Sequence, residues 1–137
     1  ATLEEALATN AKQIIVPAGI LPKFAVTRSV EIYGANYNVM PWVLNGDKVV
    51  QNPDWGKYGE SVIYKTDIVI TKEAVGANIL VSGFRMTRGF NDTARPLSEV
   101  KTSVTLENNI LDRCFETGEF REFNLTNANN KNATDNT

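Results

Sequence analysis

The sequence predicts an all-β fold: an antiparallel β-sandwich of jelly-roll or immunoglobulin-like type with about eight strands, preceded by a short N-terminal helix and arm. The first observation behind this prediction is the mid-chain run 61–70, in which apolar and polar residues alternate. Side chains of a strand point to opposite faces with a period of two, so this run predicts a long central strand with one buried face. The predicted buried face carries Val62, Tyr64, Thr66, Ile68 and Ile70.

The second observation is the spacing of turn residues. Clusters of Gly, Pro, Asn and Asp separate short apolar runs about every 8–12 residues, a spacing typical of sandwiches and barrels. The predicted organisation is therefore a helix and apolar arm in residues 1–22, a β-sandwich in residues 23–125 and a disordered, Asn-rich tail in residues 126–137.

The composition is that of one globular domain. The chain has 137 residues, of which 42% are hydrophobic and 22% charged, and its formal net charge is −2. A chain of this length buries enough surface to fold without a metal or a disulfide. The weakly acidic balance argues against a nucleic-acid partner. No apolar run approaches the length of a transmembrane helix, so no membrane partner is expected.

Histidine is absent, and Cys114 is the single cysteine. Ser-His-Asp and Cys-His catalysis are therefore impossible within this chain, and the common zinc ligand sets are missing. We predict that the protein is not an enzyme and uses no cofactor. A hydrolase that works with carboxylates is the enzymatic alternative, but no spacing singles out a pair among Glu60, Asp67, Glu116 and Glu122.

The N-terminal residues predict a short amphipathic helix from about Leu3 to Gln13. Thr2 and Glu5 form a capping-box pattern, in which each side chain reaches the backbone N–H of the other residue. Lys12 near the predicted C-terminus complements the helix dipole. An isolated helix of this length is marginal in water, so it must pack on a sheet or on another subunit.

The following segment, residues 14–22, is strongly apolar but is interrupted by Pro17, Gly19 and Pro22. It predicts an extended arm rather than a helix or a central strand. The arm either closes the core of its own domain, which is the commoner arrangement, or lies on a neighbouring chain. In the second case the subunit-contact residues are Leu3, Leu7, Ile14, Ile15, Val16, Ile20 and Leu21.

The remaining strands are predicted in order. Alternation predicts strands over 23–33, 37–44, 79–88 and 98–106. Asn45-Gly46 predicts a hairpin with a type I′ turn that joins Val43-Leu44 to residues 48–50. Strands over 110–116 and 120–125 are expected to form a final hairpin.

Two groups of side chains are candidate binding sites. Trp42, Trp55 and Tyr58 could stack on sugar rings, although aromatic residues of small domains are mostly core. Arg85, Arg88 and Arg95 could bind an acidic edge of a partner or another anion, although local pairing in a solvated loop is the commoner arrangement.

These features predict a non-catalytic structural or interaction protein. The expected role is that of a subunit in a larger assembly such as a viral or phage particle, as a coat, decoration or tail component. Its partners would be copies of itself or other subunits, because arms and tails that become ordered on neighbours tie subunits together. The alternative is a carbohydrate-binding or adhesin module that binds glycans through the exposed aromatic residues. The first reading places the protein in a virion, and the second places it outside the cell.

Overall fold

The chain folds as a parallel β-solenoid, so the predicted antiparallel sandwich is wrong. The computed structural model describes residues 2–64, 68–74, 76–87, 90–92, 103–112 and 123–126. Strands predominate, and every strand pair in the three sheets of the body is parallel. The one antiparallel pair among the described strands is a separate hairpin. Arg88, Arg95 and nearly all of the predicted tail lie outside the described residues.

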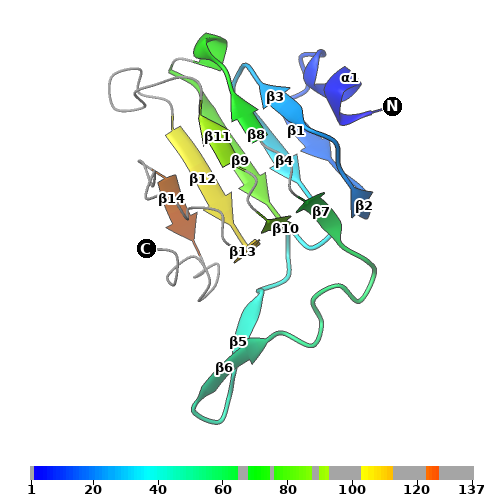
Figure 1. The fold of residues 1–137 in the computed structure, drawn as a ribbon, viewed down its shortest axis with the longest axis vertical. Helices are drawn as coiled ribbons and strands as arrows, with labels where there is room; N and C mark the ends of the chain where they lie inside the picture. Colours follow the sequence, from blue (N-terminus) through cyan, green and yellow to red (C-terminus); the bar gives the residue numbers. More distant parts are fainter. Residues whose placement is uncertain are drawn as a thin grey trace.

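Three sheets form the sides of the solenoid (Figure 1). Sheet A contains, in spatial order, β1 (Gln13–Ile15), β4 (Val30–Tyr33), β9 (Asn78–Ser82), β12 (Ser103–Glu107) and β14 (Phe123–Thr126). Sheet B contains β13 (Ile110–Asp112), β10 (Phe84–Thr87), β7 (Ser61–Tyr64) and β2 (Gly19–Ile20). Sheet C contains β11 (Phe90–Asp92), β8 (Ile68–Ile70) and β3 (Phe24–Val26).

The chain visits sheets A, B and C in the same order in each coil. The first coil is β1–β2–β3, the second is β4–β7–β8, the third is β9–β10–β11, and the fourth begins with β12–β13. A 3₁₀ turn, η1 (Lys72–Ala74), follows β8 in the second coil. Each of the first three coils contributes one strand per sheet, so strands that are neighbours in space come from successive coils, as in other solenoids.

Two of the predicted strands therefore each contain strands of two different sheets. The predicted central strand 61–70 contains β7 in sheet B and β8 in sheet C. Its predicted inward parity is also wrong, because Ser61 and Ile63 are buried whereas Val62 is half-buried. The run 79–88 bends at Gly83, and the predicted final hairpin is wrong because β13 and β14 belong to different sheets.

The core consists of columns of aliphatic side chains that run from coil to coil. Because the strands pair in parallel and in register, residues of the same parity stack directly above one another. One column is Ile14, Ile32, Val81 and Leu106, and the next is Val30, Ile79 and Val104. All seven side chains are buried.

The corner between sheets A and B is polar inside. The buried polar residues of the described chain gather around it: Asn36, Ser61, Ser82, Asn108 and Asn109. The Asn109 side chain donates to the Val81 carbonyl (2.9 Å) and accepts from the Phe84 N–H (2.8 Å). It thereby satisfies backbone groups at a bend where the regular ladder is interrupted.

Gly83 makes this corner tight. Its φ is +86°, and a Cβ atom there would collide with the backbone of Tyr37. Only glycine adopts this positive φ without strain and also leaves room for the Tyr37 backbone.

The predicted hairpin is confirmed as β5 (Trp42–Asn45) paired with β6 (Lys48–Gln51). Its turn differs from the prediction by one residue. Asn45 pairs with Lys48, so the two loop residues are Gly46, with φ +67°, and Asp47. Positive φ at the first loop position alone is the type II′ pattern rather than type I′.

The N-terminal helix α1 (Leu3–Leu7) has the predicted capping box, in which Thr2 Oγ1 accepts from the Glu5 N–H (3.1 Å). The helix is shorter than predicted because Gln13 already begins β1, which pairs with β4. Arg28 holds the end of the helix, since its guanidinium donates to the carbonyls of Leu7 (3.2 Å) and Ala11 (2.7 Å). No helix in the described ranges is long and apolar enough to span a membrane.

Candidate functional site

The second coil carries a long excursion at the corner between sheets A and B. The third coil makes this corner with Gly83 alone, whereas the second coil inserts residues 35–60 between β4 and β7. This segment, the excursion, contains the hairpin β5–β6, which projects away from the solenoid body (Figure 1). The excursion is therefore an addition to the solenoid rather than a part of its core.

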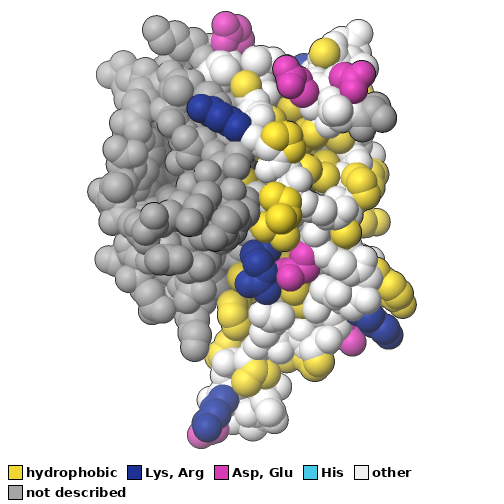
Figure 2. Space-filling view, turned by 45° about the vertical axis from the view of Figure 1, so that its right-hand side comes forward, with side chains coloured by type: hydrophobic (Ala, Val, Ile, Leu, Met, Phe, Trp, Pro, Cys, Tyr) yellow, Lys and Arg dark blue, Asp and Glu magenta, His cyan; other side chains and the backbone are white. Residues whose placement is uncertain are grey.

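Most exposed large hydrophobic side chains of the described residues lie on the excursion. They are Tyr37 (43% exposed), Met40 (53%), Leu44 (74%), Val49 (53%) and Tyr58 (86%). The other two, Ile15 and Ile20, belong to the first coil. Hydrophobic atoms are visible on the hairpin and on the surface near α1 in Figure 2. An exposed apolar surface of this kind marks an interaction site when it is contiguous.

Leu44 and Val49 form such a contiguous surface at the end of the hairpin. They are directly opposed cross-strand partners, so their side chains lie on the same face. Lys48 and Asp47 are exposed beside them at the turn. The hairpin thus presents an aliphatic pair flanked by one positive and one negative charge.

Three side chains anchor the excursion to sheet B. Glu60 Oε2 accepts from Trp55 Nε1 (2.7 Å) and from Arg85 Nε (2.7 Å), and Arg85 is on β10. The Trp55 ring is 6% exposed, so it packs as part of the anchor. A second Arg85 nitrogen donates to Gln51 Oε1 (3.3 Å), which ties the end of β6 to the same arginine.

Asparagine side chains fix the base of the excursion. Asn36 is buried; it donates to the Gly59 carbonyl (2.9 Å) and accepts from the Gly56 N–H (3.1 Å). Asn52 donates to the Met40 carbonyl (2.9 Å). These bonds hold the two ends of the excursion together, so the apolar hairpin is displayed from a fixed base.

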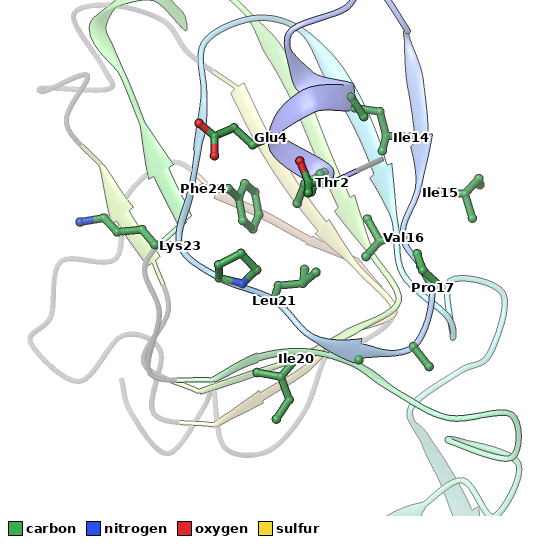
Figure 3. A pocket seen from close by; sticks show the side chains of 15 residues that line it. Thr2, Glu4, Ile14, Ile15, Val16, Pro17, Ile20, Leu21, Lys23 and Phe24 are labelled. Carbon is green, nitrogen blue, oxygen red and sulfur yellow. The ribbon is translucent and has the colours of Figure 1, made fainter.

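A second feature is an apolar pocket of about 450 Å³ at the N-terminal end of the solenoid. Figure 3 shows Ile14 and Val16 on one side, with Phe24 and Leu21 on the other. Helix α1 covers the pocket from above through residues that include Leu3 and Ala6. Glu4 and Lys23 are exposed at the rim and point outward. The pocket opens at the end of the core formed by the first coil and α1.

The outer face of sheet A carries a small polar cluster. Glu31 accepts from the Tyr33 hydroxyl (2.5 Å) and from Gln13 Nε2 (2.9 Å). The bond from Tyr33, followed by the bond from Gln13, lowers the pKa of Glu31 from 4.5. The bond to Glu31, with a smaller effect of burial, raises the pKa of Tyr33 to about 12. Tyr37 contacts the Tyr33 ring edge-on at a centroid distance of 5.2 Å.

The residues of the predicted subunit contact divide into three groups. Ile14 and Val16 are buried in the core of their own chain. Leu3, Leu7 and Leu21 are partly buried against that core. Ile15 and Ile20 are exposed, at 67% and 74%. Residues of the predicted arm are thus strands β1 and β2 of the first coil, and only two of the seven side chains are fully available to a partner.

The predicted aromatic and arginine sites are also divided. Trp55 is buried, Trp42 is half-buried and Tyr58 is exposed. Arg85 is paired with Glu60. Leu44 and Val49 were not among the predicted site residues, although the hairpin that carries them was predicted. The missed signal is that loops flank this hairpin on both sides, which leaves no adjacent strand to cover its apolar residues.

Comparisons with protein-family models, with curated proteins and with solved structures return no match for this chain. Within the described ranges, no group of three or more Asp, Glu or Cys side chains is arranged to hold a metal ion.

Proposed function

We propose that this protein is a non-catalytic interaction subunit of a larger protein assembly and that the excursion is its partner-binding element. The assembly predicted from the sequence, a viral or phage particle, remains the proposed setting. The observation that carries the proposal is the concentration of exposed large hydrophobic side chains on the excursion, at a distance from the solenoid core.

The energetics of the hairpin support this role. A two-stranded hairpin is marginally stable by itself, and each exposed aliphatic side chain is unfavourable in water. Full burial of a leucine or valine stabilises by about 1.5–3 kcal/mol, so a partner that covers Leu44 and Val49 gains several kcal/mol. The anchor formed by Trp55, Glu60 and Arg85 limits the entropy that is lost on binding, because the base is already ordered.

The glycan alternative has less support. It relied on stacking by Trp42, Trp55 and Tyr58, and the Trp55 ring is used inside the anchor. Tyr58 is the only fully exposed residue of the three, and one aromatic ring offers little surface for stacking on a sugar.

The proposal is tested by the mass of the protein in an extract of its native source. We expect the wild-type chain to elute in a high-mass complex and the double variant Leu44→Ser/Val49→Ser to elute at the mass of the free chain. The control is Asp54→Ser/Lys57→Ser, which changes two exposed polar residues of the same excursion and keeps the aliphatic pair. Retention of the Leu44→Ser/Val49→Ser variant in the complex, or elution of the wild type as a free chain, would refute the proposal.

A further inference from the structure

The same chain carries an exposed aliphatic pair and an open apolar pocket that it does not fill itself. Leu44 and Val49 lie side by side near the tip of the hairpin. The pocket of about 450 Å³ is lined mainly by apolar residues of the first coil and of α1. Its volume is within the range of sites that take up small apolar groups.

We propose that the partner of the excursion is a second copy of this chain and that Leu44 and Val49 of one copy occupy the N-terminal pocket of the next. This inference rests on the proposed function and deepens it by naming the partner. The hairpin projects away from the end of the molecule that carries α1, so it cannot reach the pocket of its own chain (Figure 1).

The charges beside the two surfaces are complementary. Asp47 and Lys48 flank the aliphatic pair at the turn, and Lys23 and Glu4 flank the pocket. A hairpin entering the pocket can therefore place each of its charges near one of opposite sign at the rim. Such rim pairs contribute little affinity, but they set the orientation in which the hairpin enters the pocket. The reversed orientation is disfavoured because it places like charges together.

The contact joins two different surfaces, so it is heterologous. Each copy offers one hairpin and one pocket, and association continues from copy to copy until a ring closes or a filament forms. Among the described strands, β1, β2 and β3 stand last in their sheets at this same end, so the neighbouring molecule also lies beside them.

The test is a complementation experiment with two variants at exposed positions. The hairpin variant is Leu44→Ser/Val49→Ser, and the pocket variant is Ile20→Trp/Lys23→Glu, which adds bulk and reverses a charge at the mouth. Circular dichroism verifies that both fold. Sedimentation equilibrium over increasing concentration measures the mass of each variant, of the wild type and of a 1:1 mixture.

We expect the wild type to self-associate progressively and each variant to self-associate at least about 100-fold more weakly. The mixture should form a dimer and nothing larger, because only one intact hairpin and one intact pocket remain. In otherwise wild-type protein, Asp47→Lys alone and Lys23→Glu alone should each weaken self-association, because each places like charges together at the rim. The double variant Asp47→Lys/Lys23→Glu restores opposite charges and should recover self-association.

Three results would overturn the inference. The hairpin variant could self-associate like the wild type, or the mixture could fail to form a dimer. The wild type could also remain monomeric at every concentration while its pocket binds a fluorescent fatty acid, which would assign the pocket to a small apolar ligand. In this last case, loss of the high-mass complex by Leu44→Ser/Val49→Ser in the native extract would leave the proposed function standing with a different partner.

Discussion

At the residue scale, the pair of Tyr33 and Glu31 shows how one hydrogen bond couples two titrations. Tyr33 donates to the Glu31 carboxylate, which raises the pKa of Tyr33 to about 12 and lowers that of Glu31 from 4.5. For Tyr33 the folded-state pKa is raised, so its contribution to stability is complete below pH 10.0 and is lost as the pH rises towards 12. For Glu31 the folded-state pKa is lowered, so its contribution is present above 4.5 and is lost as the pH falls.

The substitution Tyr33→Phe should raise the pKa of Glu31 towards 4.5, because the bond from the Tyr33 hydroxyl lowers this pKa more than the bond from Gln13 does. The hydrogen bond from Gln13 remains, so the pKa of Glu31 should rise only part of the way to 4.5. The measurement is an NMR titration of the side-chain carboxyl groups. Glu5 is an internal control, since its pKa is lowered by bonds from Thr2 that the substitution leaves intact. An unchanged Glu31 titration would show that the hydrogen bond does not form in solution.

At the scale of the element, the excursion depends on a few polar contacts rather than on the core. Glu60 and Arg85 are 29% and 32% exposed, and ion pairs at such positions contribute at most about 1 kcal/mol. The bond from Trp55 to the same carboxylate adds an amount of similar order. Removal of this carboxylate should therefore open the excursion locally without unfolding the solenoid.

Glu60→Ala should move Trp55 towards water. We expect a red shift of its fluorescence and easier quenching by acrylamide, measured with Trp42→Phe in the background so that one tryptophan reports. The global free energy of unfolding should fall by only about 1–2 kcal/mol. Asp54→Ala removes an exposed carboxylate of the same excursion but keeps the bond from the Trp55 indole to Glu60, so it should leave the emission unchanged. Equal emission from the two variants would contradict the role assigned to Glu60.

At the scale of the whole molecule, the core columns join successive coils into one cooperative unit. Ile32 lies in the second coil between Ile14 of the first and Val81 of the third, and it is fully buried. Ile15 is a neighbour of Ile14 on β1, but it points outward and is 67% exposed. The same residue type thus occupies both environments in adjacent strands.

Ile32→Ala should lower the free energy of unfolding by about 2–5 kcal/mol, because it removes buried contacts with two coils and leaves a cavity. Ile15→Ala should change it by no more than about 0.5 kcal/mol. Urea denaturation of the two variants gives the comparison. Similar losses for both would mean that Ile15 is buried in solution, or that the column is not continuous.

Features that depend on neighbouring residues could be predicted from the amino-acid sequence. The capping box of Thr2 and Glu5 starts α1, and a tight turn next to the predicted Asn45-Gly46 closes the hairpin, because these interactions form within a few residues. The division of the chain into short strands follows from alternation and turn residues in the same way. These signals place the strands but do not specify which strands pair.

The pairing of the strands, and with it the fold and the candidate site, depends on contacts between residues that are far apart in the sequence. A strand that alternates buried and exposed residues has the same pattern in a sandwich and in a solenoid, and Gly83 or Asn109 can serve a corner as well as a hairpin turn. The partner of each strand is a full coil away in sequence, so no local preference selects it. Burial of Trp55 against Glu60 and exposure of Leu44 and Val49 follow from that long-range arrangement, because exposure depends on which surfaces the coils have already covered.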